Sequence, residues 1–93
     1  MNTAAKGRKN EWRSMAILEA SGYICTRAAG SHGMWDIVGI GPTDVVLVQV
    51  KTGEWPRSVE MEALHNFVCP PFVRRLIHRW RPRKQVPDVK VLE

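Results

Sequence analysis

The chain has 93 residues, which is enough for one hydrophobic core but not for two. Hydrophobic residues make up 44% and charged residues 25%, so we expect a single globular domain over residues 1–93 and exclude a two-domain enzyme. The N-terminus lacks the apolar segment of a secretory signal, and no apolar run approaches the roughly 18 residues of a membrane span. The expectation is a cytoplasmic protein that has no membrane partner.

The net charge of +5 is unevenly distributed. Residues 1–14 carry a net charge of +3 and residues 71–85 a net charge of +6, whereas residues 15–70 carry −3. Basic flanks around an acidic centre suit a phosphodiester substrate, because phosphates need cations and catalytic metals need carboxylates. The alternative is a solvated basic surface that has no such ligand.

The two cysteines do not form a recognisable metal or disulfide motif. Cys25 and Cys69 are 44 positions apart and belong to no CxxC pair. We therefore expect two buried free thiols, without a zinc site. No motif for a small-molecule cofactor is present in the sequence, and none is expected.

The chain begins with an expected loose basic arm over residues 1–7, followed by a helix over 8–20. Asn10 is one possible cap of this helix, and Ser21-Gly22 ends it. Met15 and Leu18 follow Glu11 by four and seven positions, so Glu11 begins the face that points into the protein. The alternative is that an acid in the first turn merely complements the helix N-terminus.

A strand is expected over residues 23–27, then a small polar loop over 28–33 and a hairpin with strands 36–40 and 45–51. The second hairpin strand is apolar on both faces, as a central strand is. If Ile40 faces Val45, the antiparallel register places Asp36 opposite Gln49, with Lys51 as a diagonal neighbour. Three polar side chains then meet at one end of a buried sheet.

The second half of the chain is expected to begin with a helix over 58–68, capped by Ser58. Residues 72–80 follow a helical period, whereas strand alternation would mix apolar and basic side chains on both faces. A short edge strand is expected over 87–92. Strands and helices in this order are typical of an α/β domain.

Asp36, Gln49 and Lys51 have the chemistry that metal-dependent phosphodiester cleavage requires. A carboxylate and a carbonyl-type oxygen hold Mg²⁺ near the scissile phosphate, and a lysine on the same face polarises the attacking water or stabilises the developing charge. Simpler roles are open to each: Asp36 as a turn cap, Gln49 as the partner of a buried backbone group, Lys51 as a side chain that reaches solvent from the sheet end.

Glu11, the loop Gly30-Ser31-His32-Gly33, Asp36 and Gln49-Val50-Lys51 together resemble the PD-(D/E)XK nuclease superfamily. Within it, the chain is most similar to the archaeal-type Holliday junction resolvases and their small phage and bacterial relatives, from about residue 6 to residue 53. The resemblance implies an α/β fold with a restriction-endonuclease-like core, in which helices flank a mixed sheet. It also makes residues 72–80 a strand, which we follow against the periodicity. It also implies a Mg²⁺-dependent endodeoxyribonuclease, with Mn²⁺ as a substitute, that resolves four-way DNA junctions by paired nicks as a homodimer.

The resemblance assigns roles to individual residues. Its metal ligands are Glu11, Asp36, Gln49 and the backbone carbonyl of Val50, and its catalytic residues are Glu11, Asp36, Gln49 and Lys51. Together with the basic segments, it predicts a set of residues that contact nucleic acid: Lys6, Arg8, Lys9, Arg27, Ser31 and His32. His32 is alternatively a solvent-facing loop residue. Trp55, Phe72 and Trp80 are expected to be exposed and to offer a dimer face.

Gln49 departs from the usual signature, which has an acid at this position. An amide removes one negative charge from a site that binds a hard dication largely by charge. Either the amide oxygen ligates the metal while Glu11 supplies the charge, or the protein binds DNA without cutting it. A nuclease of the same fold that acts on other branched, nicked or duplex DNA is the further alternative.

Overall fold

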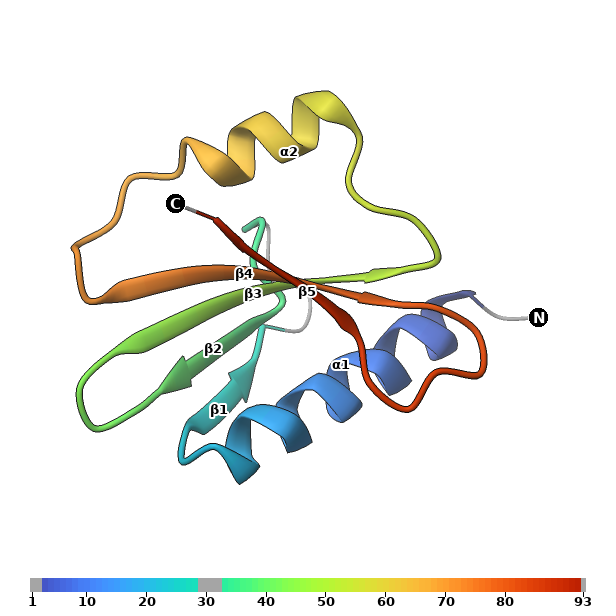
Figure 1. Ribbon diagram of the computed structural model, residues 1–93, viewed down its shortest axis with the longest axis horizontal. Helices are drawn as coiled ribbons and strands as arrows, with labels where there is room; N and C mark the ends of the chain where they lie inside the picture. Colours follow the sequence, from blue (N-terminus) through green and yellow to red (C-terminus); the bar gives the residue numbers. More distant parts are fainter. Residues whose placement is uncertain (1–2, 29–32, 93) are drawn as a thin grey trace.

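The computed structural model describes residues 3–28 and 33–92, with the backbone alone for residues 3 and 4. Its elements in chain order are α1 (Thr3–Ala20), β1 (Ile24–Arg27), β2 (Ile37–Ile40), β3 (Val45–Thr52), α2 (Ser58–His65), β4 (Val73–Trp80) and β5 (Asp88–Leu92). The strands form one sheet in the order β1-β2-β3-β4-β5, in which only the β3–β4 pair is parallel among the described strands. α1 covers one face of the sheet and α2 the other (Figure 1). The expected mixed sheet flanked by helices is confirmed.

α1 is longer than the sequence indicated. It begins at Thr3, so residues 3–7 are helical and not a loose arm, because the two alanines and the lysine in this stretch favour a helix and outweigh the unfavourable Gly7. Asn10 is not a cap but lies within the helix at 4% exposure, where its side-chain amide donates to Thr52 Oγ1 at 2.8 Å. The predicted end is confirmed: Gly22, at φ 99°, donates to the Glu19 carbonyl and Tyr23 to the Leu18 carbonyl.

α1 packs against the sheet through Met15 and Leu18, which lie in one core with Ile37 and Val48. The neighbouring Trp12 and Ile17 stay exposed at 58% and 36%. The apolar stripe is therefore narrow, and polar Asn10 and Ser14 complete the buried face of the helix.

The predicted hairpin register is confirmed from Ile40 opposite Val45 to Ile37 opposite Val48. Alternation along β3 sends Val46 and Val48 toward α1, whereas Leu47 packs in a second core under α2. A strand that is covered on both faces has no polar side, and this explains its continuous apolar run.

α2 begins at Ser58, as predicted, but Ser58 is its first helical residue and not its cap. The cap position is Arg57, whose side chain makes no capping hydrogen bond. The helix ends at His65, before the predicted residue 68, and buries Leu64 against Trp35, Ile77 and Leu92.

Residues 73–80 form β4, so the helical period of this segment was misleading and the strand implied by the resemblance is confirmed. Leu76 packs toward α1 and Ile77 toward α2, because β4 lies inside the sheet with both faces covered. A strand buried on both faces has apolar residues at consecutive positions, and these imitate a helical stripe.

Two expectations about exposure were wrong. Trp80 is 2% exposed, because it lies at the end of β4 under α1, where its indole Nε1 donates to Ser14 Oγ at 2.8 Å. Both cysteines are free, but they are half-buried and not fully buried. In the described part of the chain, neither helix has the length and apolar character needed to cross a membrane.

Candidate active site

Asp36 lies at the entry to β2, where its carboxylate is held by the neighbouring strand. The backbone N–H of Val50 donates to Asp36 Oδ2 at 2.8 Å, and the Asp36 N–H donates to the carbonyl of Val48 at 2.8 Å. The predicted proximity of Asp36 to the end of β3 is thus realised through the backbone of that strand. The carboxylate is fixed in position beside the strand that carries Gln49 and Lys51.

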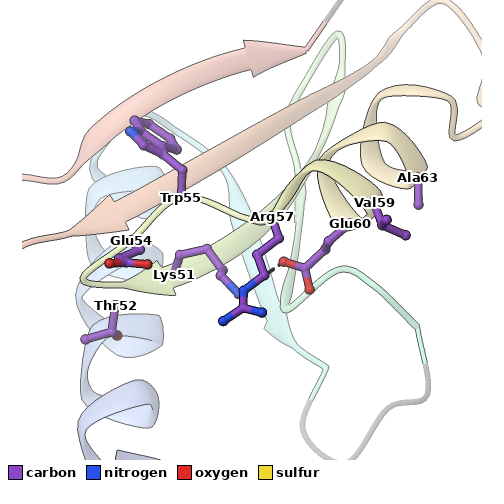
Figure 2. A pocket seen from close by; sticks show the side chains of 8 residues that line it. All are labelled: Lys51, Thr52, Glu54, Trp55, Arg57, Val59, Glu60 and Ala63. Carbon is purple, nitrogen blue, oxygen red and sulfur yellow. Dashed lines mark ion pairs between the residues drawn. The ribbon is translucent and has the colours of Figure 1, made fainter.

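Lys51 extends from the end of β3 into a pocket of about 650 Å³ between the strand end and the first turn of α2. Its Nζ lies 3.1 Å from Glu60 Oε1, and both side chains are partly exposed. Figure 2 shows this ion pair bridging the strand and the helix. β3 ends just beyond, where Gly53 adopts φ 91°, a left-handed conformation that glycine accepts without steric cost.

Glu11 lies on α1 and pairs with Arg27 at the end of β1. Arg27 Nε is 2.6 Å from Glu11 Oε1, and both side chains are about one-fifth exposed. The Arg27 guanidinium also lies 5.7 Å from the ring of Trp12. Arg27, which was predicted to contact DNA phosphate, is therefore paired with Glu11, which was predicted to bind the metal.

Gln49 is half-buried on β3, two positions before Lys51, so their side chains share the face of the sheet that α2 covers. Its partner in the parallel register is Ile77 of β4. The amide therefore has the strand position that the superfamily signature gives to an acid.

The pKa of Asp36 depends on its burial and on the charges around it. Burial raises the pKa of the Asp36 carboxyl above its ordinary value, and the hydrogen bond from Val50 opposes this rise. The carboxylates of Glu11 and Glu60 raise this pKa further, whereas the Lys51 ammonium lowers it. Three carboxylates from three separate elements thus interact electrostatically at one end of the sheet.

Asp36 and the Val50 carbonyl suit Mg²⁺ as part of a ligand set that waters and substrate phosphates would complete. Among the residues that the structure describes, no three His, Cys, Asp or Glu side chains are close enough to form a ligand cluster by themselves. Magnesium, however, is commonly held by one or two carboxylates together with waters and substrate phosphates. Asp36 and the carbonyl of Val50 offer hard oxygen atoms of this kind, and repulsion among the carboxylates favours a cation between them.

Glu60 is the residue that sequence reasoning missed. It lies in the first turn of a helix that follows β3 after a short connection, so the chain returns over the strand end that carries Lys51. The signal was available in principle, because a short strand-to-helix connection places the first helical turn near the end of the preceding strand. No spacing rule of the recognised signature includes it.

The predicted nucleic-acid contacts are only partly brought together. Lys6, Arg8 and Lys9 are exposed on the N-terminal half of α1, and Arg27 lies beside Glu11. Ser31 and His32 lie outside the described residues, so their roles remain predictions. Several arginines of residues 71–85 have structural partners instead: Arg75 donates to carbonyls at the C-terminal end of α2, and Arg79 and Arg81 pair with Asp88.

Neither protein-family models nor curated proteins match this chain. Among solved structures, the chain is similar to Hjc of Archaeoglobus fulgidus, a Holliday junction resolvase from an archaeal hyperthermophile, with a TM-score of 0.68. The two chains are 21% identical, and the similarity covers 94% of this chain and 71% of that one. The predicted restriction-endonuclease-like fold is therefore confirmed, as is the resemblance to resolvases at the level of the fold.

Proposed function

We propose that this protein is a Mg²⁺-dependent, structure-selective endodeoxyribonuclease that resolves four-way DNA junctions by paired nicks. The observation that carries the proposal is the fixed Asp36 carboxylate beside the strand end that carries Lys51. The fold shared with a Holliday junction resolvase supports the same conclusion. Four-way junctions have two-fold symmetry, and two cuts need two sites, so the proposal includes a homodimer.

Each residue of the site has a defined task in this proposal. Bound Mg²⁺, or Mn²⁺ in its place, would act as a Lewis acid for the scissile phosphate. Asp36 and the Val50 carbonyl would hold it, with Glu11 and Gln49 as further oxygen donors. Lys51 donates a hydrogen bond to the attacking water or to the phosphate oxygen that gains charge. Lys51 must exchange its contact with Glu60 for this task, and the partial exposure of both side chains allows the exchange.

The test compares wild-type protein with Asp36→Asn on labelled four-way junction, flap, nicked duplex and intact duplex, with Mg²⁺, Mn²⁺ or EDTA. We expect symmetric cuts on the junction, and a loss of cleavage by Asp36→Asn on the order of a hundredfold or more, because its hard anionic ligand is gone. Binding to junction DNA in EDTA should be retained.

Glu62→Gln is the matched control, since it removes one exposed acid from α2 and should cut as wild type does. Retained cleavage by Asp36→Asn would contradict the assignment of the site. Equal nicking of all four substrates would instead indicate a same-fold nuclease with broader specificity.

A non-catalytic DNA-binding module is the second candidate, favoured by the amide at Gln49 and by the ion pair that occupies Glu11. It predicts salt-sensitive binding to DNA and no metal-dependent cleavage. Gln49→Glu separates the two cases: in an active enzyme it should lower the Mg²⁺ concentration needed for cleavage. In a module that has only lost its acid, the same substitution should create cleavage that wild type lacks.

A further inference from the structure

A second pocket, of about 270 Å³, lies where the N-terminal half of α1 meets the turn between β4 and β5. These two segments are adjacent in Figure 1 although some 70 positions separate them in the chain. Five of the pocket's eight lining residues are cations and none is an acid: Lys6, Lys9, Asn10, Arg13, Trp80, Arg81, Pro82 and Arg83. The tertiary structure therefore joins the two basic segments of the sequence in one concave surface.

Arg13, which lines this pocket, is held by three neighbours. Its guanidinium lies 3.9 Å from the centre of the Trp80 ring and donates to the Lys84 carbonyl at 2.7 Å and to Asn10 Oδ1 at 3.3 Å. These partners are neutral, so they orient the Arg13 guanidinium without neutralising its positive charge. Among the described residues, Arg81 is the only one of the five cations that pairs with an acid, since its Nε lies 2.9 Å from Asp88 Oδ2.

Arg83 adds an independent observation from the backbone. Its φ is 66°, and it is the only non-glycine residue with positive φ in the described part of the chain. Glycine or asparagine would adopt this conformation at lower steric cost. A costly conformation at an exposed position is typical of a residue whose side chain has a task, and here Arg83 lines the pocket.

The basic pocket adjoins the pocket of Lys51. Asn10 lines the basic pocket, Thr52 lines the pocket of Lys51, and the two side chains are joined by their 2.8 Å hydrogen bond. Trp80, also in the basic pocket, is the register partner of Thr52 across β3 and β4. A DNA strand whose scissile phosphate lies at Asp36 and Lys51 would therefore pass next to the basic pocket.

We propose that this basic pocket binds the phosphate backbone of a double-stranded DNA arm that flanks the cleavage point. The proposal rests on the proposed nuclease function for the position of the DNA, but binding at the pocket requires no catalysis. Lys6 and Lys9 of α1 would contact one phosphate of the backbone, and Arg83 would contact the adjacent one. Arg13 would lie between these two contacts. Sequence-independent contact of this kind positions a duplex without reading its bases.

The experiment measures binding of a fluorescein-labelled four-way junction and of a matched duplex in EDTA, by anisotropy, from 50 to 300 mM NaCl. The pocket variant is Lys9→Gln with Arg83→Asn, because asparagine tolerates the positive φ while removing the charge. The control variant, Arg74→Gln with Lys90→Gln, removes the same charge from exposed positions that do not line the pocket. Circular dichroism and thermal melts verify that both variants fold.

We expect the pocket variant to bind both DNAs at least tenfold more weakly than wild type at 100 mM NaCl. Its slope of log K against log salt should be smaller by about 2, since each lost phosphate contact contributes about 0.9. The control variant should keep the wild-type slope. Equal weakening by the two variants, or wild-type protein that binds neither DNA, overturns the proposal.

The outcomes also separate this proposal from that of the nuclease. Pocket-dependent binding by a wild-type protein that cuts no DNA in Mg²⁺ supports the pocket and contradicts the nuclease. Metal-dependent cleavage by wild type, with unchanged DNA binding by the pocket variant, supports the nuclease and contradicts the pocket.

Discussion

His78 is a titratable residue buried between α1 and the sheet. It is 2% exposed, and its Nδ1 lies 2.9 Å from Ser14 Oγ, which also accepts the hydrogen bond from Trp80. Because the serine oxygen accepts from Trp80, its hydroxyl hydrogen is available to Nδ1, which favours the neutral imidazole with its proton on Nε2. Burial lowers the pKa of His78 from 6.5 to about 4.

This shift predicts a pH-dependent stability. As the pH falls below 6.5, His78 binds a proton in the unfolded chain but stays neutral in the folded protein. The free energy of unfolding therefore falls until about pH 4 and then levels off. The total loss is about 3 kcal/mol at 1.36 kcal/mol per pKa unit. Urea denaturation at several pH values should show this loss in wild type but not in His78→Asn, whose amide oxygen can still accept from Ser14.

The exposed His65 is the control, since His65→Asn should keep the wild-type pH profile. The raised pKa of Asp36 acts with the opposite sign, because folded Asp36 takes up its proton at higher pH than the unfolded chain does. That contribution is common to all three proteins and cancels in the comparison. Parallel profiles for wild type and His78→Asn would contradict the buried, neutral histidine.

At the residue scale, the sequence predicted Asp36 and Lys51 together because both belong to one hairpin. A turn of known length and a side-chain period of two are sufficient to place them at one end of the sheet. Glu60 escaped prediction because its position depends on the path of α2 over β3. The same holds for the partners of Arg27 and Arg75, which no local pattern specifies.

Among the elements, α2 is short and held mainly by one buried side chain. Leu64 is fully buried, whereas Val59 on the same helix is 81% exposed. Arg75 of β4 adds hydrogen bonds to the carbonyls of Leu64 and Phe67, each at 3.3 Å, and so binds the end of the helix to the sheet. The helix in turn carries Glu60 to Lys51, so its packing positions part of the candidate site.

We expect Leu64→Ala to lower the free energy of unfolding by about 3 kcal/mol, because it leaves a cavity between α2 and the sheet. Val59→Ala in the same helix should change it by less than about 0.5 kcal/mol, since its side chain is largely solvated. Urea denaturation followed by circular dichroism measures both. Similar values for the two variants would show that α2 does not depend on the second core.

β4 shows why element type was less predictable than site position. Its apolar residues fall at helical spacing because both faces of the strand are covered, and only its neighbours in the sheet distinguish the two possibilities. The resemblance supplied the correct answer where periodicity did not. α1, by contrast, was predicted in type and C-terminal end, because the Gly22 signal is local.

For the molecule as a whole, the homodimer is a prediction that can be measured directly. Phe72 remains a candidate for its face at 56% exposure, whereas Trp80 is buried and Trp55 half-buried. Sedimentation velocity should give about twice the mass of the chain, and Phe72→Glu should reduce it to that of a monomer, since a charge in an apolar interface is costly. Val68→Glu, at a 92% exposed site outside the predicted face, should leave the dimer intact.

A wild-type protein that sediments as a monomer at all concentrations, also with junction DNA, would contradict the dimer. Dissociation by both variants would indicate a general effect of added charge and not a face at Phe72.

The sequence by itself determined the fold class, the hairpin register, and the placement of Asp36, Gln49 and Lys51 at one strand end. The register and the placement follow from periodicity and short connections, which are local, whereas the fold class also needed the resemblance to a known superfamily. Only the tertiary structure decided that Glu60 faces Lys51 and that several arginines of the basic segment serve the fold. It also brought Lys9 and Arg83 into one pocket. Such contacts join distant parts of the chain, and their geometry depends on how both faces of the sheet are covered.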